Sequence, residues 1–511
     1  MVEEITAEML SILDVNSEWW GVPRQWLMEN AGAAIAAQIR ERHKSPTRMA
    51  IFCGTGGNGG DAMVVARHLY GHHPIDVFLV GGPERISSQQ AYRNWAILQG
   101  LPNLSCKILR DSAEISDVDW KSYGLYIDGI LGSGLRQSPR NPHAAIIRQM
   151  NSSRNPDRQI WSIDLPSGLL ASGRPGDPMV TADLIFALHQ AKTGSSKLAS
   201  VIVLPIGIPS DAITCSGPGY LQAFNSHPED SHKGDNGKVL LIGGSKDYHG
   251  AAIISGWAAL KSGIDLLQIY TSKEVSETIR RASAEFIVQT YDSPFFDKEA
   301  VEGAIKLAKK NDVILLGPGL GENPKVQEAV SAFVEQWMNI DPRPGLVIDA
   351  DALKYLPMLS KLGEEVIVTP HAGEFFLMTK RKLASTRQLH DRIADVQGIS
   401  QQYGVTWLVK GRVDLIASKG KVLQNHTGCA AMTVGGTGDA LAGITAGLYA
   451  RSKRPYYSAI AAAFWTGLAG EYTDSLPSGF STTAMVENLP VVWKELESFV
   501  KSEDNIYANE Y

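Results

Sequence analysis

The sequence predicts an α/β fold arranged as two three-layer domains, each with a parallel sheet between layers of helices. Three observations favour this fold. Short runs rich in aliphatic and β-branched residues alternate with helix-like periodic segments along the chain. The alternation is interrupted once, near the middle of the chain. Each half contains one glycine cluster placed directly before a helix-like run.

The strand-like runs are short and apolar, as expected for buried parallel strands. In the first half they cover residues 49–53, 75–80, 125–128, 160–163, 184–188 and 201–204. Glycine, proline and serine crowd between residues 208 and 237. The pattern then resumes at residues 238–242, 266–270, 313–316, 346–348, 366–368, 407–409 and 415–417. We therefore predict a domain over residues 1–212, a linker over 213–225 and a second domain over 226–511.

Composition excludes several classes of protein. The 511 residues are 44% hydrophobic and 20% charged, which is too apolar for intrinsic disorder. The net charge of −6 supplies no positive field for nucleic acid. No apolar run approaches the length of a membrane helix. The cysteines, Cys53, Cys106, Cys215 and Cys429, form no C-x-x-C pair, so we expect neither zinc binding nor disulfides, and a cytoplasmic location.

The first glycine cluster reads G-T-G-G-N-G-G-D over residues 54–61. It follows one strand and precedes a helix-like run, so its backbone N–H groups can bind an anion at the helix start. The spacing is neither the dinucleotide fingerprint nor the P-loop. The alternative is a turn that merely tightens the packing of the strand against the helix.

Two acidic residues end other strands of the first domain. Asp128 is followed by G-I-L-G-S-G-L, and Asp164 by L-P-S-G. Either aspartate alone could simply cap a loop. Because ligands of open parallel sheets bind at the carboxyl ends of the strands, these two segments and the glycine loop can converge on one crevice. The three together predict a site for a phosphate-bearing ligand.

These motifs, with M-E-N-A-G at residues 28–32, resemble the YjeF N-terminal domain family of NAD(P)H-hydrate epimerases over the first two-fifths of the chain. Gly57 stands where the family loop has its first Asn, and Ala62 where it has its last Gly. The resemblance implies a K⁺ site at Asn58, Asp128 and Ser167, with oxygen ligands that suit an alkali cation, and Asp164 as the acid–base group. It implies substrate contacts at Gly57, Asn58, Gly59, Gly60, Asp61, Gly132, Ser133, Gly134, Leu135, Arg136, Gln137, Ser138 and Asp164.

The second glycine cluster reads V-G-G-T-G-D-A-L-A-G-I-T-A-G over residues 434–447. A helix that starts at this turn would point its N–H groups at an anion, and Asp439 would lie in its first turn. A carboxylate there can accept the proton of a substrate hydroxyl during phosphoryl transfer. The alternative is that Asp439 only stabilises the positive end of the helix.

This cluster and T-P-H-A-G-E at residues 369–374 resemble the ribokinase-like superfamily. Further motifs narrow the resemblance to the ADP-dependent NAD(P)H-hydrate dehydratases, from residue 226 to the end. They are H-K-G-D-N-G-K-V-L-L-I-G-G-S (232–245), G-A-A (250–252), G-P-G-L-G (317–321), D-A-D-A-L (349–353) and L-V-K-G (408–411). His371 stands where the sugar and vitamin kinases often have Asn, which favours the dehydratases. The fold implied is therefore a Rossmann-like YjeF N-terminal domain followed by a ribokinase-like domain.

The second resemblance implies that Asp439 is the catalytic base and that Mg²⁺ accompanies ADP, with Glu374 as a candidate to position it through water. It implies nucleotide contacts at Lys410, Gly411, Arg412, Val413, Asp414 and Gly438. It implies contacts with the hydrated dinucleotide at Ala252, Gly319, His371 and Asp439.

The two resemblances together imply a fused repair enzyme. The first domain would interconvert the R and S hydrates of NADH and NADPH, and the second would dehydrate the S form with ADP, giving AMP and phosphate. We expect small-molecule partners only, no nucleic acid or membrane, and a homo-oligomer. Two alternatives stay open: a ribokinase-like vitamin-precursor kinase with a stable phosphorylated product, and a first domain that binds without catalysing.

Overall fold

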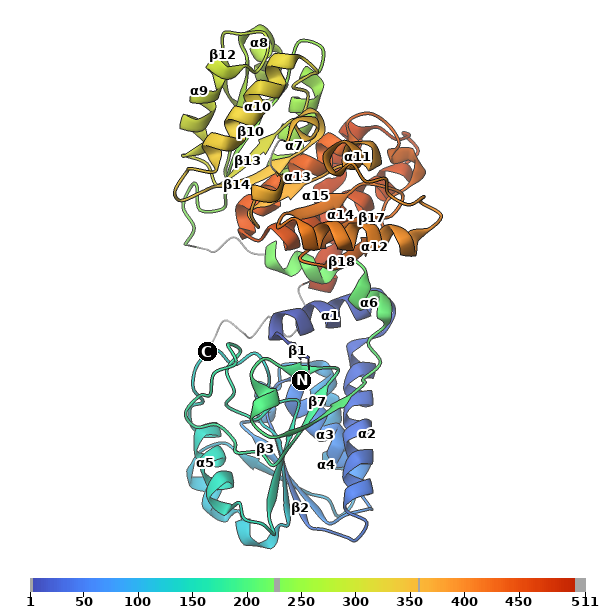
Figure 1. The fold of residues 1–511 in the computed structure, drawn as a ribbon. Coiled ribbons are helices and arrows are strands. Elements are labelled where there is room, and N and C mark those ends of the chain that lie inside the picture. Colours follow the sequence, from blue (N-terminus) through green and yellow to red (C-terminus); the bar gives the residue numbers. More distant parts are fainter. Residues whose placement is uncertain (1–2, 225–229, 357–358, 501–511) are drawn as a thin grey trace. The chain divides into compact units, whose positions relative to one another are not determined.

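The computed structural model describes residues 3–224, 230–356 and 359–500. The chain forms two compact units, one ending at Ile213 and the other spanning Thr214–Val500 (Figure 1). Within the described residues, every helix is too short or too polar to span a membrane. The cytoplasmic location and the homo-oligomer stay predictions.

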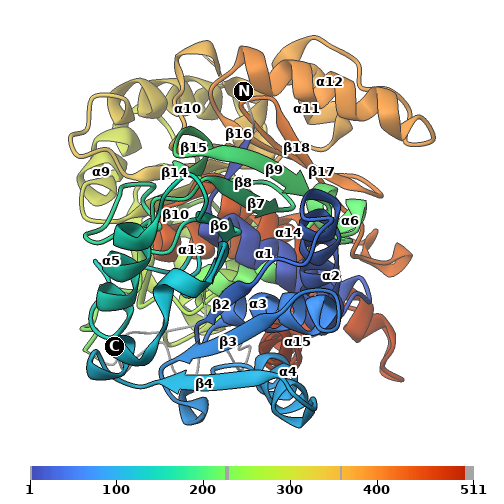
Figure 2. The same ribbon diagram turned by 90° about the horizontal axis from the view of Figure 1, so that it is seen from below.

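The first unit is built on a seven-stranded, fully parallel sheet. Its strands, in spatial order, are β4 (Ser105–Leu109), β3 (Ile75–Val80), β2 (Met49–Cys53), β5 (Leu125–Gly129), β6 (Gln159–Ile163), β7 (Leu184–Leu188) and β9 (Ser200–Leu204). Strands β4, β3 and β2 lie side by side in Figure 2. The chain runs outward from β2 in one direction and from β5 in the other, so the strand order reverses between these two strands. Such a reversal opens a crevice at the carboxyl ends of the strands.

Helices cover both faces of this sheet. The helices of this unit are α1 (Ala7–Trp19), α2 (Arg24–Arg42), α3 (Gly57–Leu69), α4 (Gln89–Gly100), α5 (His143–Ser153) and α6 (Ser210–Thr214), the last of which crosses the boundary between the units, and α2 to α5 cover the sheet. Alternate residues of each strand point to opposite faces. Ile51 of β2 therefore packs with α2, α3 and α4, whereas its neighbour Phe52 packs with α5 on the other face. Both faces are apolar because both are covered.

A second, two-stranded parallel sheet joins β1 (Glu4–Ile5) to β8 (Ala191–Lys192). The main-chain N–H of Thr193 donates to the Ile5 carbonyl at 3.0 Å. The Glu4 carboxylate accepts from the main-chain N–H groups of Gly194 at 2.9 Å and Ser196 at 3.1 Å. The first strand of the chain therefore holds the segment that follows β7.

The second unit contains a nine-stranded sheet. Its order is β12 (Ile287–Tyr291), β11 (Leu266–Ser272), β10 (Lys238–Ile242), β13 (Val313–Leu316), β14 (Gly345–Ile348), β15 (Val366–Val368), β16 (Thr406–Val409), β17 (Asp414–Ser418) and β18 (Lys421–Asn425). The first seven strands are parallel, and β17 and β18 continue the sheet as antiparallel strands. The order reverses between β10 and β13.

Helices again cover both faces. They are α7 (His249–Lys261), α8 (Lys273–Ala282), α9 (Lys298–Ala308), α10 (Pro324–Trp337), α11 (Ala372–Thr379), α12 (Leu389–Gln402), α13 (Thr437–Ser452), α14 (Pro455–Asp474) and α15 (Thr482–Val500). The sheet face that carries Leu316 and Ile348 packs with α9, α10 and α12. Helices α13 and α14 pack on the opposite face. The three-layer α/β architecture predicted from the sequence is present in both units.

Helix α13 packs unusually close to α7. A Cβ at Gly443 would lie 2.2 Å from the carbonyl oxygen of Ser255, and the Ser255 hydroxyl donates to the Asp439 carbonyl at 2.9 Å. Glycine at this position lets the two helix backbones approach each other, and the serine ties the first turn of α13 to α7. Asp439 is thereby held on a rigid element.

All strands predicted from the sequence are present, and the structure adds β1, β4, β8, β12 and β18. The described part of the predicted linker 213–225 is also structured. A 3₁₀ helix spans Pro218–Phe224, and the side chains of Tyr220, Leu221 and Phe224 are buried. Glycine and proline disrupt the periodic pattern here, but these apolar residues still pack within the second unit.

Candidate active sites

An open cavity of about 520 Å³ lies at the carboxyl ends of the first unit's strands. Its lining combines the glycine loop before α3, the loop after β5 and Asp164 after β6. Helices α1 and α2 complete the wall with Leu10, Asp14, Arg24, Leu27, Met28 and Ala31. The three motifs expected to converge therefore do line one cavity.

Two glycines permit the close packing behind this cavity. The Gly54 main-chain N–H donates to the Gly129 carbonyl at 2.9 Å. A Cβ at Gly54 would lie 1.8 Å from the Ile130 carbonyl oxygen, and one at Gly59 would lie 1.9 Å from the Gly54 carbonyl oxygen. Any larger residue would push the start of α3 away from β5. The glycines thus bring the N–H groups of the first turn of α3 to the cavity.

Asp128 is the centre of a buried polar cluster. Its Oδ1 accepts the Ser167 hydroxyl at 2.5 Å, and its Oδ2 accepts the Ser162 hydroxyl and the Ser167 N–H, both at 2.8 Å. Burial raises the pKa of Asp128, although these hydrogen bonds oppose the rise. Asn58 donates through Nδ2 to the Leu131 carbonyl at 3.1 Å, whereas its buried Oδ1 has no hydrogen-bond partner among the described residues. An acceptor left in this state is a candidate ligand for a cation.

Asp164 lies at the rim of the same cavity and is almost fully buried. Its Oδ1 is 2.5 Å from Nζ of Lys192 and accepts the Leu188 main-chain N–H at 3.1 Å. Asp61, in the first turns of α3, also lines the cavity. Burial raises the pKa of Asp61 well above its usual range, and the carboxylates of Asp164 and Asp14 raise it further. The cavity therefore holds an ion-paired carboxylate and a carboxyl group that favours its neutral form.

In the second unit the glycine cluster forms the turn before α13. Gly436 has φ +93° and precedes the helix, a conformation that favours glycine. The Thr482 hydroxyl donates to the Gly435 carbonyl at 2.8 Å and fixes the turn. Gly438 lies against Lys410, because a Cβ at Gly438 would be 3.4 Å from the ammonium nitrogen. Lys410 thus reaches the positive end of α13, where a bound anion would meet both.

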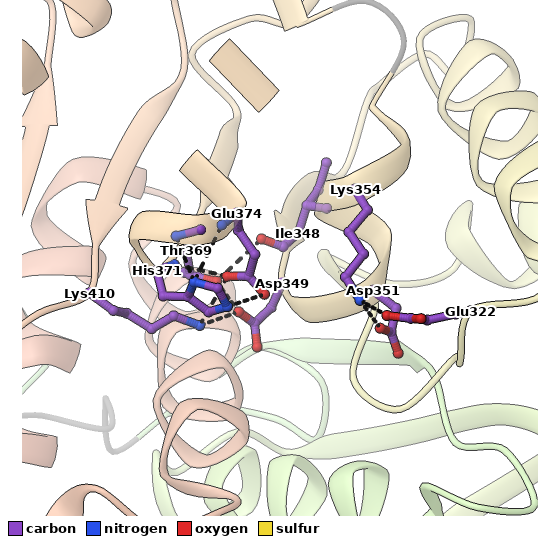
Figure 3. A network of polar contacts seen from close by, with 10 residues as sticks. Glu322, Ile348, Asp349, Asp351, Lys354, Thr369, His371, Glu374 and Lys410 are labelled. Carbon is purple, nitrogen blue, oxygen red and sulfur yellow. Dashed lines mark hydrogen bonds and ion pairs between the residues drawn. The ribbon is translucent and has the colours of Figure 1, made fainter. Parts of the chain in front are cut away.

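Lys410 is the cation of a buried network formed where β14, β15 and β16 end (Figure 3). Its Nζ lies 2.8 Å from Oδ1 of Asp349 and 4.0 Å from Oε2 of Glu374. Asp349 Oδ1 also accepts the Thr369 hydroxyl at 2.7 Å. Burial lowers the pKa of Lys410, but the carboxylates of Asp349 and Glu374 outweigh it, so the pKa lies above its usual value. The lysine is therefore charged.

Asp439 is the third residue of α13. Burial raises its pKa to about 7, with a further contribution from the negative charge of Asp349 and an opposing one from Lys410. Its carboxylate receives no hydrogen bond from the described residues. A carboxylate with a pKa near 7 is a stronger base than an ordinary aspartate and is still ionised in a large fraction of molecules at neutral pH.

His371 caps the start of α11. Its Nδ1 accepts the main-chain N–H groups of Gly373 at 3.0 Å and Glu374 at 3.3 Å, and the Glu374 carboxylate accepts the main-chain N–H of His371 at 2.8 Å. Since Nδ1 accepts, the proton of the neutral ring lies on Nε2. The imidazole side chain is 60% exposed. His371 therefore combines a structural cap with a polar group open to a ligand.

Comparison with known proteins identifies the family. A family model for NAD(P)H-hydrate dehydratase matches residues 239–488, and one for YjeF-related protein N-termini matches residues 24–194. The bifunctional NAD(P)H-hydrate repair enzyme Nnr of Methanothermobacter thermautotrophicus is 39% identical over 498 residues, which cover 94% of each chain. That of Pyrobaculum aerophilum is 37% identical over 507 residues, covering 96% of this chain and 98% of the relative. The chain belongs to the bifunctional NAD(P)H-hydrate repair enzymes.

A solved structure is similar to part of this chain. It is the ADP/ATP-dependent NAD(P)H-hydrate dehydratase from Bacillus subtilis, co-crystallised with ATP and Mg²⁺. It is 29% identical, covers 56% of this chain and 99% of its own, and has a TM-score of 0.47.

The structure brings most of the predicted epimerase residues of this family member together, and places others apart. Of the predicted contacts, the cavity lining includes Gly57, Asn58, Asp61, Gly132, Ser133, Gly134, Leu135 and Asp164. Arg136, Gln137 and Ser138 lie outside that lining on an exposed loop. Gly59 and Gly60 lie beneath it, in the packing of α3 against its neighbours.

Some of the predicted dehydratase residues also lie together, whereas others lie apart. Gly438, Lys410 and Asp439 meet at the start of α13, and Gly411 donates its N–H to Asp414 at 2.9 Å. Arg412 is exposed and Val413 is half-buried on the same turn, and burial raises the pKa of Asp414 to about 6. Ala252 and Gly319 are buried, and a Cβ at Gly319 would lie 2.2 Å from the Tyr248 carbonyl oxygen.

Among the residues whose roles were not predicted from the sequence, Asp349 and Lys192 form buried ion pairs in these sites. Asp349 belongs to the D-A-D-A-L motif, which was recognised, but no role followed from it. Lys192 follows β7 in the segment A-K-T-G, and nothing in the sequence distinguishes it from a solvated lysine. Only its position could have indicated a role. Lys192 follows a predicted strand, and the other predicted site residues lie at the same carboxyl ends of the strands.

Proposed function

We propose that the chain repairs hydrated NADH and NADPH in two reactions. The first unit epimerises the R and S hydrates, and the second dehydrates the S hydrate with ADP, giving AMP and phosphate. The observation that carries the proposal is the start of α13, where Asp439, with a pKa of about 7, lies in the same turn as Gly438, which contacts the charged Lys410. A base and a phosphate-binding cation are both needed there for phosphoryl transfer.

Dehydration follows from these groups in two steps. Asp439 takes the hydroxyl proton while the substrate oxygen attacks the terminal phosphorus of ADP, and AMP leaves with the electron pair of the broken P–O bond. The N–H groups before α13 and the Lys410 ammonium stabilise the charge of the transferred group. The bond between the ring carbon and the phosphate oxygen then breaks, and phosphate leaves with its electron pair while the neighbouring ring carbon loses a proton to water. This elimination restores the double bond of the dihydronicotinamide.

Mg²⁺ bound with the nucleotide would neutralise phosphate charge. Within the described residues, no group of three or more His, Cys, Asp or Glu side chains is arranged to hold a metal ion. A cation here would therefore be held largely by the phosphates and water, as is common for Mg²⁺. Glu374 and Asp349 are the carboxylates of the Lys410 network that could position such waters.

Epimerisation needs both a base and an acid, because the hydroxylated carbon is bonded to the ring nitrogen. Asp164 takes the hydroxyl proton as a carbonyl forms, and the electron pair of the broken C–N bond goes to nitrogen, which takes a proton from Asp61. Rotation of the aldehyde followed by the reverse transfers closes the ring with the opposite configuration. No atom is gained or lost overall. The neutral form that burial favours for Asp61 suits the acid role.

A K⁺ ion at Asn58, Asp128 and Ser167 would offset the phosphate charge of the substrate. The buried, unpartnered Oδ1 of Asn58 supports this site, because it offers an oxygen that no described protein group uses. Asp128 supplies the negative charge nearby, and Ser167 supplies a hydroxyl bonded to it. Oxygen donors of this kind suit a hard cation.

The direct test is recovery of absorbance at 340 nm from separate R and S hydrates, with ADP and ATP compared side by side. We expect S hydrate to be repaired with nucleotide alone, and R hydrate to be repaired by the same chain after epimerisation. A persistent phosphorylated alcohol would instead support the vitamin-precursor kinase. R hydrate that disappears no faster than in buffer would leave the first unit as a binding module.

A further inference from the structure

Lys192 occupies a position that a solvated lysine would not take. Its side chain is only 3% exposed, and its ammonium lies 2.5 Å from Oδ1 of Asp164. The same nitrogen donates to the carbonyls of Leu188 at 2.7 Å and Gln190 at 3.0 Å. The three N–H bonds of the ammonium are thus matched by three acceptors. The lysine is fixed in place and in orientation.

This contact leaves the two oxygens of Asp164 in different states. Oδ1 accepts both the Lys192 ammonium and the Leu188 N–H, whereas Oδ2 receives no hydrogen bond from the described residues. Asp164 also has φ +66°, a left-handed conformation that is costly for a residue other than glycine. Strained backbone of this kind persists where the surroundings hold it, and Lys192 is the strongest such contact of this side chain. Because Asp164 lines the cavity, Oδ2 is the oxygen available to a ligand.

Lys192 is itself held from outside the cavity. It pairs with Ile5 in the two-stranded sheet, and Glu4 fixes the turn that follows through Gly194 and Ser196. Each of these contacts comes from the first residues of the chain. The lysine therefore lies on a short strand that is itself fixed by Glu4 and Ile5. Supporting contacts of this kind hold a functional side chain within about 0.5 Å of its working position.

We propose that Lys192 is a positioning residue for epimerisation: its ammonium holds Oδ1 of Asp164 and leaves Oδ2 as the oxygen that takes the substrate's hydroxyl proton. This inference rests on the proposed epimerase function of the first unit. Lys192 acts through Asp164 and does not itself exchange a proton. The other charged groups that line this cavity are Asp61 on α3, Asp14 on α1 and Arg24 on α2, whereas the ion pair of Asp164 is with Lys192.

A purely structural role is the competing explanation. Buried ion pairs often add little to stability compared with apolar residues of similar volume. Removing one partner, however, leaves an uncompensated buried charge, so a single substitution could lower activity simply by destabilising the unit. The experiment must therefore separate positioning from folding.

The main variant is Lys192→Met, which keeps the length of the side chain and removes its charge. Its matched control is Lys197→Met, an exposed lysine five residues further along the same segment. Both full-length proteins are assayed for the loss of R hydrate and, separately, for dehydration of S hydrate with ADP. We expect Lys192→Met to lower kcat for epimerisation by about 100-fold with little change in KM, since proton transfer rather than binding is lost. Dehydration in the same molecules should be unchanged.

The double variant Lys192→Met/Asp164→Asn keeps the inference testable if the single variant is unstable, because it removes both charges together. If Lys192 acts through Asp164, epimerisation in the double variant equals that of Asp164→Asn alone. The inference would be overturned if the double variant lost the product of the two single losses in kcat, or if folded Lys192→Met protein had a normal kcat. If the unmodified chain fails to epimerise R hydrate, the proposed function fails instead, and the two failures are thereby distinguished.

Discussion

The two sites use an aspartate and a buried lysine in different ways. In the first unit the lysine pairs directly with the proposed base, since Lys192 lies 2.5 Å from Asp164. In the second unit Lys410 pairs at 2.8 Å with another carboxylate, Asp349, and the proposed base Asp439 receives no hydrogen bond from the described residues. The same two residue types thus give one ion-paired base and one base whose pKa is raised to about 7.

This difference follows from what each reaction demands of the lysine. Epimerisation moves protons within one substrate, so a lysine can be committed permanently to orienting the base. Phosphoryl transfer brings additional negative charge to the site, so a cation must remain available to the phosphate. Asp349 balances the charge of Lys410 without using Asp439, and its negative charge also makes Asp439 a stronger base. Substituting Asp439 and Asp349 separately therefore tests the two roles.

The largest effect is expected for Asp439→Asn. The amide keeps the shape of the side chain but cannot take a proton, so dehydration of S hydrate should fall by at least about 10³-fold. Binding of ADP, measured by calorimetry, should change little because Lys410 and the turn before α13 remain. Epimerisation by the same protein serves as the internal control. Dehydration at the rate of the unmodified chain would exclude Asp439 as the base.

The next effect concerns the pH dependence of dehydration. A base acts when ionised, so kcat/KM in the unmodified chain should fall as the pH drops through about 7, the pKa of Asp439. Asp349→Asn removes a neighbouring negative charge and should move this fall to lower pH, because the pKa of Asp439 decreases. Misplacement of Lys410 should also lower kcat by about 10-fold or more.

The matched control for Asp349→Asn is Glu322→Gln. Glu322 pairs with Lys354 in the same region, but its side chain is 72% exposed. Its pH profile should superimpose on that of the unmodified chain. An Asp349→Asn profile that also superimposes would show that Asp349 does not act on Asp439.

The fold could be predicted from the sequence where strands are buried on both faces. β2, β7 and β13 are continuous apolar runs, because helices cover both sides of each sheet. Three of the strands missed, β4, β12 and β18, are edge strands with partly exposed residues. Polar residues such as Lys107, Gln289 and Gln424 interrupt their apolar pattern. An edge strand needs no continuous apolar run, so periodicity alone does not reveal it.

The site residues, too, could be predicted from the sequence only in part, but for a different reason. Asn58, Asp128 and Asp439 could be named in advance because each lies at the end of a strand or the start of a helix, within a glycine-rich motif. Lys192 could not, because its position depends on an ion pair with Asp164, which follows a different strand, and on pairing with Ile5, which is 187 positions away along the chain. Ion pairs between distant segments leave no local signal in a single sequence.

A smaller effect is expected for Asp61→Asn, measured as epimerisation of R hydrate against pH. A neutral carboxyl donates its proton only below its pKa, so epimerisation by the unmodified chain should fall as the pH rises through the raised pKa of Asp61. The amide cannot donate in this way, so the variant should lose this alkaline fall and be about 10-fold slower at neutral pH. If the same alkaline fall persists in the variant, another group is the acid.

The smallest effects come from restoring the two family residues that this loop lacks, and they should differ in kind. Gly57 begins α3, and a Cβ at this position would have no atom within 4 Å, so Gly57→Asn should change the unfolding free energy by less than about 0.5 kcal/mol. Ala62 is fully buried, and its methyl group fills the space beside the backbone of Gly129. Ala62→Gly should therefore cost about 1–2 kcal/mol, through lost packing and greater freedom of the unfolded chain. Denaturant unfolding of both variants measures the two free energies. Equal changes in the free energy of unfolding would mean that the Ala62 methyl group does not stabilise the unit by packing beside Gly129.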